Sequence, residues 1–190
     1  MKTLFYSKVS NRVRVLVSSK WARVLFVPCS AGHVKHVCKG SCCFNSKGIL
    51  NVTITPREEA YIEKLGGIVK NGFLQPRDGE KRCPFQHENG LCKIHKKKPI
   101  GCAISPFNLS GHNTVVIRYR YVCMNCHKDG TVPAYKVFRK SLDVMFGKKE
   151  SRRICEHFDN GGGNIMAYMF GDVWEDLVFN RKARKENENQ

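Results

Sequence analysis

Cysteine is the residue with the most evident chemistry in this sequence, with ten copies in 190 residues. Eight of them stand in three groups, at uneven intervals. Eight thiolates suffice for two four-cysteine metal sites, or for one iron–sulfur cluster and a second site. The candidate metal ligands are Cys38, Cys42, Cys43, Cys83, Cys92, Cys102, Cys123 and Cys126.

A disulfide framework and a set of core thiols are the alternatives to metal. Disulfides persist in oxidising compartments. Residues 1–17 lack the long apolar run and the small-residue cleavage site of a secretory signal. Core thiols belong on the apolar faces of regular elements, and only Cys155, in RRICEHF, fits that pattern. We therefore expect a metal site.

Two cysteine pairs carry different information. Cys123 and Cys126 form a C-x-x-C pair, whose spacing lets two sulfurs reach one ion. Cys42 and Cys43 are adjacent. Neighbouring side chains of an extended backbone point to opposite faces, so we expect these two thiols to serve different sites, or one of them to be buried.

The wide intervals from Cys83 to Cys92 and from Cys92 to Cys102 bear on the choice of metal. Zinc sites more often contain two close cysteine pairs. The spacing therefore favours an iron–sulfur centre. All-thiolate sites suit both metals, so zinc stays open, as does the number of sites.

Two basic segments near the N-terminus are the first elements expected. Residues 12–17 and 23–27 alternate like strands, and residues 18–20 suit a turn between them. This pattern predicts a basic N-terminal β-hairpin.

Helix signals follow. Thr55, Pro56 and Glu58 predict a helix start with a capping box, and Gly66 and Gly67 predict its end. Further helices are expected over residues 133–147, 151–158 and 164–179.

Residues 114–122 alternate and predict a strand. That strand would place Arg118 and Arg120 on one face and Tyr119 and Tyr121 on the other.

Residues 68–112 show little periodicity and predict irregular backbone. Ordering such backbone costs about 1–2 kcal/mol per residue, and a structural zinc site contributes on the order of 10 kcal/mol. The expected fold is therefore a small single α+β domain with the basic hairpin, a long irregular cysteine-rich metal-binding middle and C-terminal helices. We expect a basic arm at 1–28, the metal-binding domain at 29–180 and a disordered polar tail at 181–190.

The segments CKGSCC, VTITPREEAYI and CPFQHENGLCKIHKKKPIGCAISPF resemble the CxxCxxCC family, a zinc- or iron-chelating domain whose relatives include the flagellin N-methylases. The resemblance covers about residues 29–126. The matching positions of its second part are Cys83, Pro84, Phe85, Gly90, Cys92, Ile94, Pro99, Cys102 and Pro106.

Several positions depart from the family pattern. One cysteine of the first motif is shifted or missing, and Cys29 is a candidate to replace it. His95 stands for a tyrosine and Lys98 for an arginine. The sulfur ligands stay intact. The resemblance implies a metal or iron–sulfur centre and, through the methylase relatives, S-adenosylmethionine chemistry.

The net charge of +17, with a pI near 9.6, predicts attraction to polyanions. Nucleic acid or a ribonucleoprotein is the expected partner, and a dispersed, solvated positive surface is the alternative. The candidate contacts are Arg118, Arg120, Lys96, Lys97 and Lys98.

Two classes of function follow. The first is a metal-binding protein with a basic surface that contacts nucleic acid. The second is an iron–sulfur enzyme that modifies a protein or nucleic acid, including by S-adenosylmethionine-dependent methylation. No catalytic residue can be named, because no Ser/His/Asp order or paired-carboxylate motif stands out. The substrate and the oligomeric state also stay open.

We expect no membrane contact, because no apolar run of about 18 residues occurs. The cytoplasm is the expected location. No acidic residue precedes Glu58, a composition also seen in organellar transit peptides. An organellar matrix is therefore the alternative.

Overall fold

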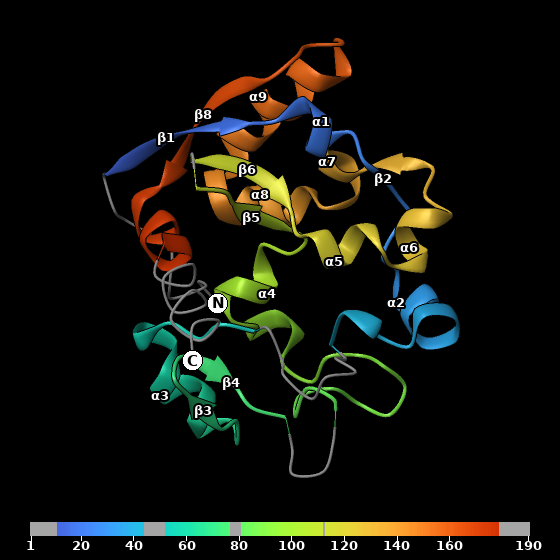
Figure 1. Cartoon of the computed structure of the whole chain (residues 1–190), viewed down its shortest axis with the longest axis vertical. Coiled ribbons are helices and arrows are strands. Elements are labelled where there is room, and N and C mark those ends of the chain that lie inside the picture. The colour runs from blue at the N-terminus through green and yellow to red at the C-terminus, as the bar shows by residue number, and fades with distance from the viewer. Residues whose placement is uncertain (1–10, 44–51, 77–80, 112, 179–190) are drawn as a thin grey trace. The chain divides into compact units, whose positions relative to one another are not determined.

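The computed structural model describes residues 11–43, 52–76, 81–111 and 113–178 (Figure 1). The chain forms two compact units. The first combines Met1–Pro28 with Ala103–Val178, and the described part of the second lies within Cys29–Cys102. The chain combines helices with a mostly antiparallel main sheet, so the α+β class is confirmed. The expected domain boundaries stay predictions, and the expected tail at 181–190 lies outside the described residues.

A four-stranded sheet organises the first unit, in the order β5-β6-β1-β8. β1 (Arg12–Val17) pairs antiparallel with β8 (Ile165–Phe170) along its whole length. On its other side β1 pairs parallel with β6 (Thr114–Ile117), which pairs antiparallel with β5 (Phe107–Leu109).

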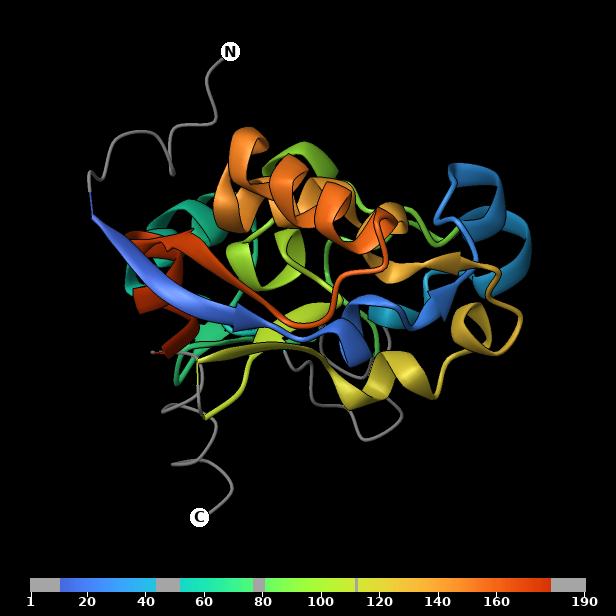
Figure 2. The same ribbon diagram turned by 90° about the horizontal axis from the view of Figure 1, so that it is seen from above.

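Side chains on one face of this sheet form part of the core of the first unit. Val15 and Val17 of β1 and Ala167 and Met169 of β8 are buried. Helices α7 (Ala134–Val137), α8 (Arg139–Phe146) and α9 (Lys148–Asp159) are the orange coils that lie on one side of the blue and red strands in Figure 2. Full burial of an aliphatic side chain contributes about 1.5–3 kcal/mol.

The basic N-terminal hairpin does not form. Residues 12–17 and 25–26 are strands as predicted, but β2 (Leu25–Phe26) pairs with β7 (Val132–Pro133). A helical turn, α1 (Ser19–Ala22), stands where the hairpin turn was expected. Alternation identifies a strand without identifying its partner, and here β1 is buried between two strands from the later part of the chain.

The C-terminal half contains one expected helix and two corrections. α9 covers the predicted helix 151–158 and extends beyond it at both ends. The predicted helix 133–147 is divided into α7 and α8 at Phe138, whose φ of −106° and ψ of 34° interrupt the helix. The predicted helix 164–179 is wrong in its first part, because residues 165–170 are strand β8 and helix begins only at residue 171.

The predicted strand 114–122 is also too long. β6 ends at Ile117, and Arg118 is the N-cap of α5 (Tyr119–Val122). A second helical turn, α6 (Asn125–Lys128), follows. Arg118 and Arg120 therefore do not share the face of one strand.

The second unit has a small core, made by Val52, Ile54, Ile62, Leu74 and Phe85. Cys83 and Cys102 pack against this core. The longest of its described helices is α3 (Pro56–Lys64), which has the predicted capping box and ends two residues before Gly66, whose φ is +85°.

Short elements fill the rest of the second unit. They are the hairpin of β3 (Val69–Lys70) and β4 (Phe73–Leu74), and the turns α2 (Ala31–His33), η1 (Val34–Cys38), η2 (Ser41–Cys43), η3 (His95–Lys97) and α4 (Ile100–Ala103). The described part of residues 68–112 is otherwise largely irregular apart from β5.

One buried carboxylate joins two of these pieces. Glu58 accepts hydrogen bonds from the Thr55 amide at 3.1 Å and from the Ile100 amide at 2.6 Å. Burial raises the pKa of Glu58, while these two amides act to lower it. The Ile100 bond ties α4, and with it Cys102, to the N-terminus of α3.

Candidate metal centre

Cys42 and Cys43 are adjacent in the sequence, and their thiols are also close in space. Their Sγ atoms lie 3.9 Å apart, both on the 3-10 turn η2. With metal–sulfur bonds of about 2.3 Å, two ligands of a tetrahedral ion stand about 3.8 Å apart. The backbone here turns instead of extending, so the premise that the two side chains point to opposite faces is wrong, and their assignment to different sites stays a prediction.

Three further thiols act on Cys43 electrostatically. Its pKa is raised first by the hydrogen bond with Cys42, then by burial, and then by the charges of Cys42, Cys102 and Cys83. Like charges disfavour ionisation only at short range. Cys42, Cys43, Cys83 and Cys102 therefore share one neighbourhood.

Cys92 joins this neighbourhood through Cys83 and Cys42. The pKa of Cys83 is raised to about 11, first by burial and then by the charges of Cys92 and Cys42, against a hydrogen bond from the Phe85 amide. Burial also raises the pKa of Cys92, and Cys42 adds to the increase.

Cys29 and Cys38 are also linked to this neighbourhood. Burial raises the pKa of Cys29, and the charges of Cys42 and Cys38 raise it further. Cys42 thus acts on four other thiols, those of Cys29, Cys43, Cys83 and Cys92. The sequence did not single out this central position.

Two glycines let the cysteine-bearing loops cross. Gly40 has a φ of +66° and Gly90 a φ of +85°, both in the left-handed region. A Cβ on Gly90 would lie 2.6 Å from the Lys39 carbonyl carbon, and a Cβ on Gly40 would overlap the Gly90 carbonyl oxygen. The loop of Cys38–Cys43 and the loop of Cys83–Cys92 therefore approach backbone to backbone.

Gln86 links the two loops at this crossing through hydrogen bonds. Its Nε2 donates to the carbonyl oxygens of Lys39 at 3.1 Å and Gly40 at 3.0 Å. The Cys83 amide donates to the Cys43 carbonyl at 3.0 Å. The sequence analysis missed Gln86, because no spacing or charge distinguishes it from a surface glutamine.

Lys98 lies beside the thiols. Its charge acts to lower the pKa of both Cys29 and Cys92. Lys96 and Lys97, in contrast, are exposed on η3. One of the three lysines predicted to contact nucleic acid thus also contributes to the electrostatics of the cysteine cluster.

Cys123 and Cys126 belong to the first unit. Cys123 is exposed at the end of α5, and a hydrogen bond with Cys123 raises the pKa of Tyr119. Cys126 lies on α6. The C-x-x-C pair thus spans two helical turns and not a strand end, and its role as a ligand pair stays a prediction.

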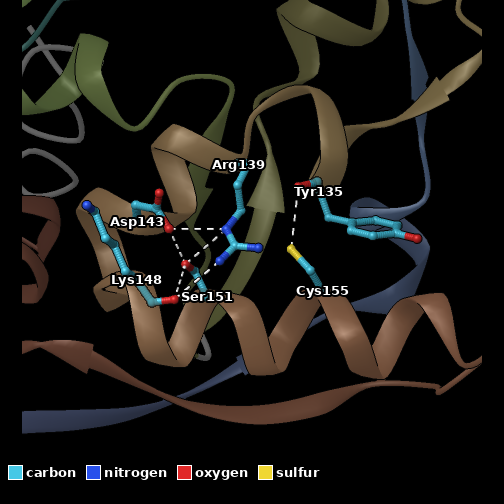
Figure 3. Close-up of polar contacts among 6 residues, drawn as sticks. All are labelled: Tyr135, Arg139, Asp143, Lys148, Ser151 and Cys155. Atoms are coloured by element: carbon cyan, nitrogen blue, oxygen red, sulfur yellow. Dashed lines mark hydrogen bonds and ion pairs between the residues drawn. The ribbon is translucent and has the colours of Figure 1, made fainter.

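Cys155 lies in the core of the first unit, as its apolar pattern suggested (Figure 3). Its thiol donates to the Tyr135 carbonyl at 3.7 Å. The neighbouring Arg139 donates to Asp143 and to Ser151, each at 3.1 Å, and so joins α8 to α9. Helix packing explains this cysteine without a metal.

The Arg118 backbone and the Arg120 side chain both have partners within the first unit. Arg118 donates its backbone amide to Pro106 at 3.0 Å. Arg120 lies over the Tyr121 ring, 5.0 Å from its centroid, and donates to the Tyr121 hydroxyl at 3.3 Å.

The donor set fits a thiophilic metal, although the side chains are not closed around one point. Within residues 11–43, 52–76, 81–111 and 113–178, no three His, Cys, Asp or Glu side chains are placed to hold an ion as they stand. Burial and mutual repulsion nonetheless raise the pKa of several thiols. A metal cation favours the thiolate form that both effects oppose.

Comparison with known proteins identifies one family. A family model described as "Putative zinc- or iron-chelating domain" matches residues 33–127, which is half of the chain. Comparisons with the curated proteins and with the solved structures found no match. Among the described helices, none has the length and apolar character needed to cross a membrane.

Proposed function

Because the chain belongs to the CxxCxxCC family of zinc- or iron-chelating domains, we propose that it is a metal-binding protein whose thiols hold an iron–sulfur centre. The ligands would come from the unit of Cys29–Cys102. The observation that carries this proposal is the crossing of the two cysteine-bearing loops, where the Cys42 and Cys43 sulfurs lie 3.9 Å apart and the Cys83 amide donates to the Cys43 carbonyl at 3.0 Å.

The number of thiols favours a cluster over a single zinc ion. A structural zinc ion takes four ligands, whereas seven cysteines stand between residues 29 and 102. A polynuclear cluster, or two separate ions, uses more of them. The wide C-x8-C and C-x9-C intervals support the cluster.

Each part of the unit has a definite task in this proposal. Cys42, Cys43, Cys83, Cys92 and Cys102 hold the metal, which supplies electron transfer or structural cross-linking. Gln86 and the glycine crossing keep the two cysteine loops together. The small core of the unit places Cys83 and Cys102.

Elemental analysis of anaerobically purified protein tests the proposal. We expect iron and sulfide, with absorbance near 400 nm. Stoichiometric zinc in a colourless protein would replace the iron–sulfur assignment with zinc. Absence of any bound transition metal would overturn both.

We further propose that the basic surface contacts a polyanion, namely nucleic acid or a ribonucleoprotein. The net charge of +17 supports this partner. The candidate contacts remain Arg118, Arg120, Lys96, Lys97 and Lys98, of which Lys96 and Lys97 are the exposed lysines. The enzymatic alternative stays a prediction.

Filter binding in rising salt tests the polyanion contact. Each phosphate contact contributes roughly −0.9 to the log–log salt slope on duplex DNA. Replacement of Lys96 and Lys97 together by Gln should therefore reduce the magnitude of the salt slope by about one to two. No binding of duplex DNA or structured RNA at low salt would remove this partner.

A further inference from the structure

The sheet of the first unit has a second face, opposite its core. Alternate residues of β1 and β8 are buried against the core, and those between them are exposed or half-buried. We name this second face the arginine–tyrosine face. Its residues on β1 and β8 are Arg12, Arg14, Leu16, Met166, Tyr168 and Phe170.

Cations and aromatic rings lie opposite one another across this face. The register pairs Arg12 with Phe170 and Arg14 with Tyr168. Directly opposed residues in an antiparallel pair have Cβ atoms about 4.5–5.5 Å apart. The face therefore combines positive charge with ring surface along two neighbouring strands.

Arg12 is held in place. Its guanidinium stands 4.0 Å from the Phe170 centroid and donates to the carbonyl oxygens of Phe146 and Tyr168. This arginine covers the Phe170 ring, so that ring is occupied from within the chain.

Tyr168 and Arg14 are the accessible pair. Tyr168 is 51% exposed, and Met166 beside it is 36% exposed. Arg14 is exposed, and its guanidinium forms no hydrogen bond or ion pair with any residue that the structure describes. An exposed ring next to a cation that has no counter-ion among the described residues suits a ligand with both a flat apolar surface and a negative charge.

Positive residues outnumber negative ones at this strand pair. Glu150 is the carboxylate at the β8 edge, and Arg153 binds it in a bidentate pair at 2.7 and 3.0 Å. Arg12, Arg14 and Arg153 thus outnumber Glu150 among the charged residues described at this strand pair.

We propose that the arginine–tyrosine face binds single-stranded nucleic acid, with Tyr168 as the stacking surface for a base and Arg14 as a phosphate contact. The proposal rests on the polyanion contact proposed above, adds a second surface to its candidate contacts, and names the ligand class. Base stacking on an aromatic residue tolerates any sequence, because every base has a flat face. In a duplex the bases are already stacked, so they cannot reach Tyr168.

Fluorescence anisotropy with labelled single-stranded RNA, single-stranded DNA and the matching duplexes tests the proposal on the full chain. We expect the single strands to bind more tightly than the duplexes. Tyr168→Ala should weaken single-strand binding about 5- to 100-fold, and Tyr168→Phe should restore it. Arg14→Gln should reduce the magnitude of the salt slope by about 0.7.

Tyr119→Ala is the matched control. Tyr119 is 78% exposed in the same unit, but it lies on α5 and not on the sheet. Tyr119 stands between the candidate contacts Arg118 and Arg120, so we expect this variant to lose less single-strand affinity than Tyr168→Ala. Unchanged metal content and circular dichroism would show that each variant is folded.

Three results would overturn the proposal. Equal single-strand affinity of Tyr168→Ala and the parent would remove the stacking role. Equal losses in Tyr168→Ala and Tyr119→Ala would remove the assignment to the sheet face. In both cases binding by the parent would leave the polyanion contact standing, whereas no binding of any nucleic acid at low salt would remove both proposals.

Discussion

Single residues decide the chemistry of the cysteine cluster, and Cys42 stands at its centre. It is close to Cys43, and its charge also raises the pKa of Cys29, Cys83 and Cys92. Cys155, in contrast, is a buried thiol whose partner is a backbone carbonyl. The two residues have the same functional group and should respond differently to substitution.

Cys42→Ser is expected to lose most of the bound metal, because it removes the sulfur that the other thiols surround. Cys92→Ser and Cys102→Ser should also lower the metal content. Cys155→Ala should keep the full content and cost about 1 kcal/mol of stability through the loss of a small buried group. Elemental analysis beside thermal unfolding checks all four variants, and a loss of metal in Cys155→Ala would contradict the assignment.

At the scale of elements, two cysteine-bearing loops of the unit Cys29–Cys102 cross at Gly40 and Gly90. The two cysteine-bearing loops come together there because their backbones touch where side chains are absent. Gly66 has the same φ of +85° as Gly90, but an added Cβ there would meet nothing within 4 Å. The chain therefore contains its own control for the crossing.

Gly90→Ala should displace the two loops and release metal, since its Cβ would collide with the Lys39 backbone. Gly66→Ala should cost only the left-handed backbone penalty of roughly 1–2 kcal/mol and keep the metal. Metal content and protease sensitivity of both variants provide the measurement. Equal metal loss would mean that backbone strain, and not the crossing, controls the site.

The outer edge of β8 is a second point where one element depends on another. Strand edges promote intermolecular pairing unless they are covered. Here Glu150 of α9 accepts from the Tyr168 amide at 3.0 Å, and Arg153 donates to the Met166 carbonyl at 2.7 Å. Helix α9 thus satisfies the edge with a charged pair.

Glu150→Gln should lower stability by roughly 1 kcal/mol at pH 7, because a charged hydrogen-bond acceptor is lost. Arg153 and the Tyr168 amide hold the pKa of Glu150 below its usual value, while partial burial acts to raise it. A lowered folded-state pKa contributes stability above the unfolded value, about 4.3. That stability is lost as the pH falls through the folded pKa.

The difference between the parent and Glu150→Gln should therefore disappear below pH 4. Urea unfolding across the pH range measures it. Glu156→Gln, an exposed change on the same helix, is the control. A difference that stays constant with pH would exclude the ion pair as its cause.

The sequence predicted an element correctly where the residues that interact lie close together in the chain. Thr55, Pro56 and Glu58 predicted helix α3 and its capping box, because all their partners lie within one turn. The partners of β1 could not be predicted, because pairing depends on burial by strands at the far end of the chain. For Cys42 and Cys43 the sequence predicted the residue type, but the short distance required knowledge of the backbone turn.

At the scale of the whole molecule, the two units differ in how much apolar burial supports them. The first has a sheet with helices packed on one face, whereas five buried residues form the core cluster described for the second. The second unit should therefore depend more on its metal.

Removal of metal by a chelator should raise the rate of proteolysis within residues 68–102 and leave cleavage within α8 and α9 unchanged. The reason is that ligation contributes on the order of 10 kcal/mol to a structural site. Limited proteolysis followed by mass spectrometry locates the cuts. Simultaneous cleavage in both units would show that they unfold as one.

The discontinuous make-up of the first unit has a consequence for synthesis of the protein. Arg12 pairs with Phe170, so β1 leaves the ribosome long before β8 does. At 5–20 residues per second, the delay is roughly 10–30 s. All seven cysteines of Cys29–Cys102 emerge within that interval. A metal ion that binds these cysteines as they emerge would therefore meet a nascent chain whose first strand still has neither of its neighbours.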